Sequence, residues 1–404
     1  MMPTAEPQQT QACESLPSDL RVALVHDWLT GMRGGEHCLE VFCEIFPRAH
    51  LYTLLHLPQR VSPTIEALPI HTSYLQKLPA AARSYRWALP LFPHAVESFD
   101  LAAYDLVLSS SHSVAKAAIP AARALSVCYC FTPMRYIWDR FDDYFGQKSP
   151  PVQWTIGKVA GRLRRWDRAT AGRVRLWLPI SREVRRRIQE FYGVADRDLD
   201  IIYPPVNTDI FRPENVAGPP LGLQSAGYDL VVSALVPYKR IDLAIRAAMA
   251  EGRHLVIVGQ GPEAKRLRRL AGEVPGTGRV TFAPPVVSAE LPAYYAHCRA
   301  FLFPGHEDFG ITPLEATACG RPVVAYRAGG ALDTVREGLN GIFFAEQSVT
   351  SLAAALRDER LAGTWDTVAM QAHARSFSRA RFKQEMTRRL ALAWQRFRRG
   401  EPHV

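Results

Sequence analysis

The sequence predicts an α/β protein built from two doubly wound, Rossmann-like domains that face each other across a cleft. Three observations support this fold class: the length of the chain, the alternation of short β-rich apolar runs with amphipathic helical patterns, and a break near Tyr203 after which the alternation restarts. The chain has 404 residues, which is too long for one ordinary domain and suits two. Its apolar fraction of 48% can bury large cores, and the strand–helix alternation is typical of parallel sheets covered on both faces.

The first domain is predicted to span residues 20–205. It opens with the apolar run RVALVHDW (residues 21–28), which is followed by Gly34-Gly35 and a helical pattern from Glu36 to Phe46. Further strand-like runs lie at residues 106–110, 126–131 and 176–180.

A segment rich in proline, glycine and asparagine, YPPVNTDIFRPENVAGPPLGLQSAG from Tyr203, is predicted to be the linker. The second domain follows, over residues 206–375, with no sign of a tandem sequence repeat. Its predicted strands lie at residues 229–235, 254–258, 279–282, 300–304, 322–326 and 341–344. Sheets of this kind bind ligands at the carboxyl ends of their strands, and a cleft between two such edges suits two substrates.

The start of the chain and the cysteines bear on localisation. Residues 1–19 lack both a charged start and an apolar run, which predicts a disordered tail and not a signal peptide. No apolar stretch approaches the length of a membrane span, and the seven cysteines show no disulfide framework or zinc pattern. We therefore expect a cytoplasmic protein, at most attached to a membrane surface.

The net charge of +10 indicates an anionic partner (nucleic acid, phospholipid or a phosphorylated substrate), or simply a solvated basic face.

The segment AFLFPGHEDFGITPLEATACG (residues 300–320) carries the strongest chemical signal. It reads as a buried strand, a loop and a helix, with Thr312 as N-cap, Pro313 in the first position and Glu315 completing a capping box. Gly320 is predicted to end the helix.

A helix start after a glycine loop offers free N–H groups and a positive dipole end, which suits a phosphate. Glu307 precedes that point and Glu315 lies one turn into the helix, so both could accept hydrogen bonds from sugar hydroxyls. A phosphate site flanked by two such acceptors fits a nucleotide sugar. The alternative is that Glu315 only caps the helix and that Glu307 is only a loop charge.

Other strand ends supply further polar groups. Lys239 and Arg240, in SALVPYKR, could neutralise a diphosphate leaving group, or could be solvated cations. Gly34-Gly35 could let a backbone approach a phosphate, or could form a plain turn. His112 follows a buried strand in DLVLSSSHSVAK and is predicted to face the cleft, although a lone histidine is more often structural. The GQG of VIVGQGPE is most simply a tight strand-to-helix turn.

Taken in order, these strings resemble the retaining glycosyltransferases of family 4, which have the GT-B fold, and within them the WbaZ-like mannosyltransferase branch. The resemblance covers nearly everything after the tail. The strings that carry it are HDWLTGMRGGE, SSSHSVAK, TPMRYIWD, YPPVNTDIF, SALVPYKRIDLAI, VGQGPE, FPGHEDFGITPLEATACGRPVVAYRAGG and GLNGIFF.

The resemblance implies a role for each matching residue. Glu307 would hold the donor sugar's hydroxyls, Lys239 would stabilise the leaving diphosphate, and His112 would contact the sugar at the reacting centre. The remaining donor-binding positions would be Gly34 and Gly35 near the phosphates and acceptor, Arg240 beside Lys239, Val286 and Leu291 near the base, the amides of Phe309, Gly310, Ile311 and Thr312, and Glu315 on the ribose.

Two positions depart from the family pattern. Many members carry arginine where this chain has Ala234, so Arg240 could supply the missing cation, or phosphate binding could be rearranged. Relatives often carry histidine where this chain has Phe131, which puts any role of that histidine in doubt and strengthens the case for His112.

The function implied by the resemblance is transfer of a hexose, with mannose from GDP-mannose as the expected donor, onto a lipid-linked saccharide with retention at the anomeric carbon. The N-terminal domain would take the acceptor, and a C-terminal helix (residues 376–404) would pack back on it.

We expect no cofactor and no metal, since the acidic string DRDLD (residues 196–200) reads as a solvated loop. The alternatives are a nucleotide-sugar epimerase of the same fold and a non-catalytic anion-binding module. The latter would be a nucleic-acid binder, but the chain lacks a nucleic-acid-reading motif, so no nucleic-acid partner is expected.

Basic residues interleave with Trp154, Trp166 and Trp177 across residues 158–187 and just before them. Such a stretch could lie on an anionic membrane surface, where a lipid-diphosphate acceptor would be found. The alternative is a solvated helix face followed by one buried strand.

Overall fold

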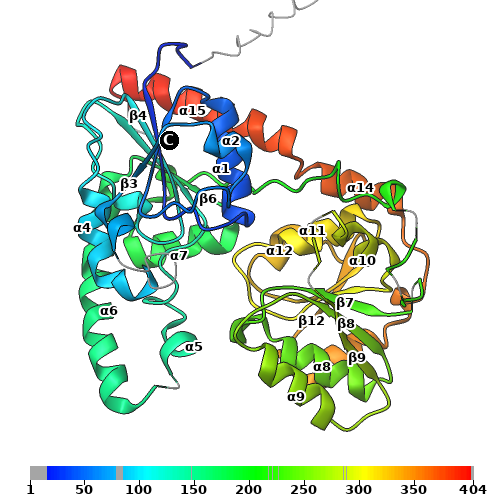
Figure 1. Ribbon diagram of the computed structural model, residues 1–404. Coiled ribbons are helices and arrows are strands. Elements are labelled where there is room, and N and C mark those ends of the chain that lie inside the picture. The colour runs from blue at the N-terminus through cyan, green and yellow to red at the C-terminus, as the bar shows by residue number, and fades with distance from the viewer. Residues whose placement is uncertain are drawn as a thin grey trace, which may run out of the picture.

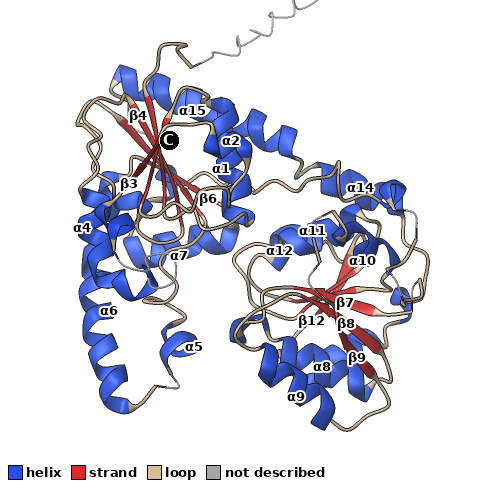
Figure 2. Ribbon diagram, viewed as in Figure 1, coloured by secondary structure: helices blue, strands red, loops and turns tan. Residues whose placement is uncertain are grey.

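The protein, described by a computed structural model, consists of two α/β domains, each built on a six-stranded parallel sheet (Figures 1 and 2). The structure describes residues 16–401 except 79–84, 147, 217, 221, 226, 285 and 288. Residues 1–15 of the predicted tail and residues 402–404 lie outside the described residues. The predicted fold class is confirmed.

The N-terminal sheet has the strand order β3-β2-β1-β4-β5-β6, with all pairs parallel. Its strands are β1 (Val22–His26), β2 (His50–Thr53), β3 (Ile70–Thr72), β4 (Leu106–Ser111), β5 (Leu125–Cys130) and β6 (Leu176–Pro179). The central strands β1, β4 and β5 are buried along their whole length, which is why they read as continuous apolar runs. The strand β2 and the edge strand β3 beside it are short, and the apolar patterns did not predict them.

Helices cover both faces of this sheet (Figure 2). They are α1 (Gly34–Ile45), α2 (Pro63–Glu66), α4 (Phe92–Glu97), α5 (Phe141–Phe145), α6 (Pro150–Thr170) and α7 (Arg182–Tyr192). Short 3-10 segments lie at η1 (Tyr74–Lys77), η2 (Tyr85–Leu91), η3 (Ala115–Ala117), η4 (Ala171–Arg173) and η5 (Asp196–Asp198).

The C-terminal sheet has the order β12-β11-β10-β7-β8-β9, which read from β9 is the same topology as in the first domain. Its strands are β7 (Asp229–Val232), β8 (His254–Val258), β9 (Arg279–Phe282), β10 (Phe301–Phe303), β11 (Val323–Tyr326) and β12 (Gly341–Phe344). Its helices are α8 (Ile241–Ala250), α9 (Ala264–Glu273), α10 (Leu291–His297), α11 (Ile311–Ala318), α12 (Ala331–Thr334) and α13 (Val349–Leu356). The 3-10 segments η6 (Pro213–Asn215), η7 (Pro237–Lys239) and η8 (Glu359–Leu361) complete the set.

The end of the chain crosses back to the first domain (Figure 1). Helix α14 (Thr367–Arg375) packs on α11, and α15 (Arg379–Arg399) packs on α1. Phe382 of α15 is fully buried against the rings of Phe42 and Tyr129. Aromatic burial on this scale ties α15 to the N-terminal core.

Strand order places two switch points, one between β1 and β4 and one between β7 and β10. At such points successive crossovers leave the sheet in opposite directions, which opens a crevice at the carboxyl ends of the two strands. The loops that follow β1, β4, β7 and β10 are therefore where ligands of this fold are expected to bind.

Candidate active site

The residues predicted to do chemistry follow the four strands at the two switch points. Gly34 and Gly35 follow β1, His112 follows β4, and Lys239 with Arg240 follows β7. The segment from Glu307 to Thr312 follows β10. The two stretches of each domain thus lie together at one edge of their own sheet, because the parallel strands of a sheet end at the same edge.

Glu307 and Lys239, the two central predicted groups, form an ion pair with each other. Both side chains are largely buried, at 18% and 17% exposure. Lys239 ends η7, and Gly305 lies so close to it that a Cβ there would sit 3.0 Å from the Lys239 Cα. The two loops are therefore packed together, and a donor would find a carboxylate and an ammonium already side by side.

The loop Glu307–Gly310 is held from behind by two glycines. Gly330 donates its N–H to the Glu307 carbonyl at 2.8 Å, and a Cβ on Gly330 would lie 2.1 Å from the Phe309 Cα. Gly329 has φ +61°, and a Cβ there would lie 2.4 Å from the Glu307 carbonyl oxygen. Only glycine lets these backbones approach so closely.

Helix α11 begins two residues earlier than the sequence predicted. Gly310 is its N-cap and has no side-chain cap, so Thr312 is not the N-cap and no capping box forms. Gly310 has room for no side chain, since a Cβ would sit 2.7 Å from Thr334 Oγ1. The N–H groups at Ile311 and Thr312 are therefore free for a ligand. Gly320, with φ +71°, follows the helix end as predicted.

Glu315 does not cap α11; its Oε2 accepts a hydrogen bond from the Tyr295 hydroxyl at 2.6 Å. Desolvation raises the pKa of Glu315 to about 7, against which the Tyr295 bond acts only weakly. A ligand hydroxyl in place of water would give this buried carboxyl group a further hydrogen-bond partner.

Arg240 stands in the left-handed region, with φ 50° and ψ 40°, at the N-cap of α8. Its Nε contacts Asp242 Oδ1 at 3.3 Å, and its side chain is 34% exposed. A non-glycine residue in this conformation is uncommon and is found most often at turns and functional sites. Ala234, the position where relatives carry arginine, is exposed.

The N-terminal side of the cleft meets the donor side directly. Gly34 is the first residue of α1, and a Cβ on it would lie 3.1 Å from Ile311 Cδ1, the first residue of α11. The starts of two helices thus face each other across the cleft. Gly35 packs on Phe131, where a Cβ would be 3.4 Å from the ring.

His112 is held by a carboxylate that the sequence did not single out. Its Nδ1 lies 3.0 Å from Oδ2 of Asp27, the residue after β1, and its ring lies edge-on against Trp28 at 4.5 Å between centroids. Asp27 is fully buried and His112 is 31% exposed. His112 therefore reaches the cleft while its inner nitrogen is fixed.

Val286 lines a cavity of about 290 Å³ beyond the ends of β8 and β9, together with Gly259, Gln260 and Arg268, whereas Leu291 is not among the lining residues. Leu291 begins α10, the helix that also carries Tyr295, the partner of Glu315. Gly259 and Gly261 pack on the end of β7, where a Cβ would collide with the carbonyls of Ser233 and Leu235, so this GQG forms a close turn.

A charged cluster from both domains surrounds the cleft, and the sequence patterns did not reveal it. Asp308, next to Glu307, forms ion pairs with Arg135 and Arg187, both from the N-terminal domain. Burial alone would raise the pKa of Asp308, but the two guanidinium groups outweigh it and the pKa is lowered. Arg135 also contacts the Tyr238 hydroxyl at 3.3 Å, beside Lys239.

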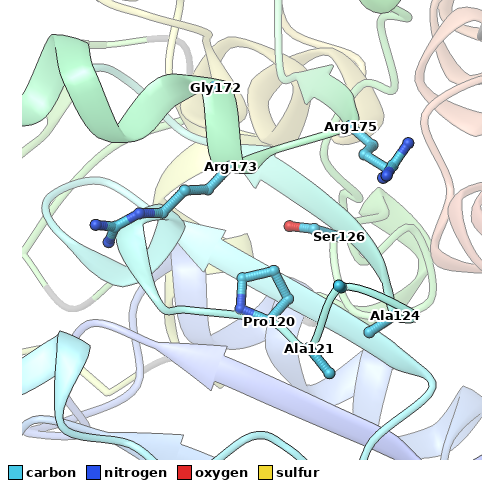
Figure 3. Close-up of a pocket in the computed structure, with 8 residues that line it drawn as sticks. Pro120, Ala121, Ala124, Ser126, Gly172, Arg173 and Arg175 are labelled. Atoms are coloured by element: carbon cyan, nitrogen blue, oxygen red, sulfur yellow. The ribbon is translucent and has the colours of Figure 1, made fainter.

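A larger cavity, of about 370 Å³, lies elsewhere (Figure 3). Arg173, Arg175 and Ser126 line it at the opposite, amino-terminal edge of β5 and β6. The two arginine side chains diverge from the serine in Figure 3. None of the predicted site residues lines this cavity, so it is separate from the cleft.

The basic, tryptophan-containing stretch is not one surface segment. Trp177 lies in β6 and is 1% exposed, and Arg187 is buried in its pairs with Asp308 and Asp139. Trp166 donates its Nε1–H to Glu97 at 3.0 Å. Trp154, in the first turns of α6, is 68% exposed. The structure thus matches the alternative of a helix face followed by one buried strand, with Trp154 and Trp166 on α6 and Trp177 in β6.

The acidic string at residues 196–200 forms η5 and the turn after it, and Asp196 and Asp200 pair with Arg185 and Arg389. Within the described residues no group of three or more metal-ligating side chains comes together. Among the helices of the described part of the chain, none combines the length and the hydropathy that a membrane crossing requires.

Comparison with known proteins finds relatives of part of the chain and structures that share its fold. Residues 227–359 match the sequence family described as "Glycosyl transferases group 1". A D-inositol 3-phosphate glycosyltransferase of Acidothermus cellulolyticus is 38% identical over 176 residues, 39% of each chain. A GDP-mannose-dependent alpha-(1-6)-phosphatidylinositol monomannoside mannosyltransferase of Mycobacterium tuberculosis is 34% identical over 221 residues, which cover 50% of this chain and 57% of that protein. The matched region of the chain thus covers 39% and 57% of the length of these two relatives.

Solved structures match over nearly the whole chain. Anabaena Alr3699/HepE in complex with UDP superposes with a TM-score of 0.63 at 18% identity, covering 92% of this chain and all of that one. Sucrose-phosphate synthase of Thermosynechococcus elongatus gives a TM-score of 0.65 at 16% identity, over 94% and 98% of the two chains. At such identities the likeness shows the fold alone. The chain therefore has the GT-B fold, and its second domain carries a region that matches the group 1 glycosyl transferases.

Proposed function

We propose that the protein is a glycosyltransferase that moves a hexose from a nucleotide-sugar donor to an acceptor bound on the N-terminal domain. The observation that carries the proposal is the meeting of Glu307 and Lys239 beside the free start of α11, at the switch point of the second sheet. A carboxylate suits sugar hydroxyls, while an ammonium and free N–H groups suit a diphosphate. The match of residues 227–359 to group 1 glycosyl transferases supports the same assignment.

The donor would lie along the C-terminal domain. Glu307 would hold the sugar, Lys239 and the amides of Ile311 and Thr312 would hold the diphosphate, and Glu315 would hold the ribose. Val286 and Leu291 would border the base. Arg240 would supply positive charge beside Lys239, and Arg135, which contacts the Tyr238 hydroxyl next to Lys239, would add to it. Negative charge grows on the diphosphate as the glycosidic bond breaks, so these cations would act mainly in the transition state.

We infer that the donor is GDP-mannose and that transfer retains the anomeric configuration within the cleft, without a metal. The support is the similarity to the GDP-mannose-dependent relative. Retention requires attack from the face that the diphosphate leaves, and the leaving group itself would accept the acceptor's proton. No cofactor takes part in such a step, and catalysis would rest on orientation and electrostatics.

A thermal-shift screen across nucleotide sugars tests donor binding. A donor at about a hundred times its Kd should stabilise the protein by about 2.7 kcal/mol, and Lys239→Ala should reduce that shift for the same donor.

The epimerase alternative predicts conversion of the donor alone, whereas a transferase needs an acceptor for rapid turnover. Activity that is undiminished in excess chelator is expected; loss restored by manganese would contradict the metal-free proposal.

The acceptor is proposed to be lipid-linked, with the protein bound from the cytoplasm to an anionic membrane surface. The surface that supports this is the tip formed by α5 and the first turns of α6, which project from the N-terminal domain in Figure 1. Tyr144, Val152 and Trp154 are exposed there, and Lys158 lies 5.3 Å above the Trp154 ring. Exposed apolar groups beside cations suit anionic headgroups.

Vesicle sedimentation tests the membrane proposal. Trp154→Ser should weaken binding to phosphatidylglycerol vesicles, and added salt should weaken it further. Val368→Ser, which removes an equally exposed apolar side chain from α14, is the matched control. Equal binding to neutral phosphatidylcholine vesicles, or no effect of Trp154→Ser, would count against this surface.

A further inference from the structure

Asp27 makes an unusual number of contacts for a buried carboxylate. Its Oδ2 accepts the N–H groups of His112 at 2.7 Å and Ser113 at 2.9 Å, and its Oδ1 accepts those of Val114 at 2.7 Å and Ala115 at 2.8 Å. The carboxylate thus binds the whole loop between β4 and η3. Since four backbone donors converge on one group, the loop has a single well-defined shape.

The same carboxylate also holds the His112 ring. Oδ2 lies 3.0 Å from Nδ1 of the imidazole. Burial favours the neutral acid, but the His112 ring, its N–H and the nearby His26 ring outweigh burial and lower the pKa of Asp27 to about 2. Asp27 is therefore an anion at any working pH and can only accept. The Nδ1 of a neutral His112 must then carry the hydrogen.

The other ring nitrogen is left for a ligand. Within the described part of the chain, no group bonds Nε2 of His112, and the side chain is 31% exposed at the cleft. Two aromatic rings limit the rotation of the His112 ring. The Trp28 ring stands at 85° to it, and the centroid of the Phe131 ring lies 6.4 Å from its centroid. Nε2 of neutral His112 is thus a hydrogen-bond acceptor with a fixed direction.

We propose that Asp27 is a positioning residue, which selects the Nδ1–H tautomer of His112 and so presents Nε2 as the acceptor of a hydroxyl hydrogen from the sugar. This inference rests on the proposed function for the role of His112. It adds the residue directly after β1 to a candidate site in which Gly34 and Gly35 were the groups from that loop. A carboxylate that orients a histidine in this way acts through the histidine and does not touch the substrate.

Nitrogen NMR of the 15N-histidine-labelled protein tests the tautomer without any substrate. At a pH where His112 is neutral, the wild type should show a protonated Nδ1 and an unprotonated Nε2, with the signal assigned by its loss in His112→Ala. A wild-type ring with hydrogen on Nε2 would overturn the proposal directly, with no variant required. Asp27→Asn should shift the ring toward the Nε2–H form.

Measurements of turnover then distinguish a positioning role of Asp27 from a general effect on folding. Asp27→Asn should lower kcat by about a hundredfold with little change in KM for the donor, and combining it with His112→Ala should cost little more than His112→Ala alone. Asp105→Asn, at the other end of β4, removes a carboxylate that binds Arg21 at the surface and should leave both tautomer and kcat unchanged. Additive losses in the double variant would overturn the inference. Full turnover by His112→Ala would instead refute the role of His112 in the proposed function, while the tautomer result would stand.

Discussion

Single residues in the cleft carry charges whose partners come from distant parts of the chain. Glu307 pairs with Lys239, His112 with Asp27, and Glu315 with Tyr295. Two of these acids sit in opposite electrostatic settings: a neighbouring imidazole and four N–H groups keep Asp27 ionised, whereas burial favours neutral Glu315. The environment, more than the residue type, therefore decides which carboxyl can serve as an anion.

The raised pKa of Glu315 predicts how stability depends on pH. The folded protein holds this proton up to about pH 7, whereas the unfolded chain loses it near 4.5, the ordinary pKa of a glutamate side chain. Between those values the folded state binds more protons, so this group makes stability fall as pH rises. Glu315→Gln should remove the effect and raise the free energy of unfolding at pH 8 by on the order of 2 kcal/mol, with little change at pH 4.5. Urea unfolding at the two pH values measures this, and an equal effect at both would contradict the assignment.

Sequence patterns predicted candidate residues after the strands at the two switch points, but not the partners that the structure gives them. Glu307, Lys239 and His112 follow predicted strands, and the carboxyl ends of parallel strands gather at one edge. Asp27, Asp308 and Arg135 were missed because their roles depend on contacts between residues 85 to 173 positions apart. Asp27 directly follows a predicted strand, and that position was the one signal available. The misplaced N-cap at Thr312 has a local cause: Gly310 can start the helix without a side-chain cap because its free N–H groups face the cleft.

At the scale of elements, the loop after β10 is shaped by the loop before α12. Gly329 and Gly330 press on the backbone from Glu307 to Phe309, and Tyr203 stacks on Phe309 with 5.8 Å between ring centroids. The start of α11 is thereby aimed at Gly34 and the start of α1. Central strands and their helices were predictable since burial on both faces gives continuous apolar runs. The strand β2 and the edge strand β3 were not, since they are only four and three residues long.

Gly330→Ala should displace the loop that carries Glu307. Its Cβ would stand 2.1 Å from the Phe309 Cα, and backbone cannot yield cheaply there. We expect a loss of kcat of tenfold or more and a cost in stability of about 1–3 kcal/mol. Turnover and thermal unfolding of the purified variant measure both.

Gly272→Ala is the matched control for this substitution. Gly272 lies in α9 with no atom within 4 Å of an added Cβ, so alanine should raise stability by about 0.5–1 kcal/mol and leave kcat unchanged. If Gly330→Ala behaved like the control, the loop would not depend on this close approach.

At the scale of the molecule, the two domains are joined by the linker near residue 206, by the return of α15, and by ion pairs across the cleft. Asp308 binds Arg135 and Arg187, Tyr203 donates its hydroxyl to Asp333 at 3.0 Å, and Arg140 donates to the His306 carbonyl at 3.0 Å. The two-domain architecture was evident from the restart of the strand–helix alternation. The contacts between the domains were not, because charged side chains give no periodic pattern.

Removing the Asp308 carboxylate should loosen the domain pair. Asp308→Ala leaves the buried guanidinium group of Arg187 and the partly exposed one of Arg135 without their shared anion. The free energy of unfolding should fall by up to about 3–5 kcal/mol, the cost of breaking a fully buried pair. Small-angle X-ray scattering should show a larger radius of gyration without donor, and KM for the donor should rise. Asp358→Ala, which breaks an exposed pair with Arg360, should change neither quantity. An unchanged radius of gyration in Asp308→Ala would show that the other contacts alone hold the domains.

Turnover of a panel of nucleotide sugars, GDP-mannose included, by the wild type and by Glu307→Ala tests the central claim most directly. Lipid-linked saccharides extracted from bacterial membranes would serve as acceptors, and circular dichroism would confirm that the variant is folded. The wild type should transfer the sugar of at least one donor, and Glu307→Ala should lose at least about a hundredfold in kcat because the hydroxyl acceptor is gone. Transfer by Glu307→Ala at the wild-type rate, or no donor consumed by the wild type, would contradict the assignment of this cleft as the transferase site.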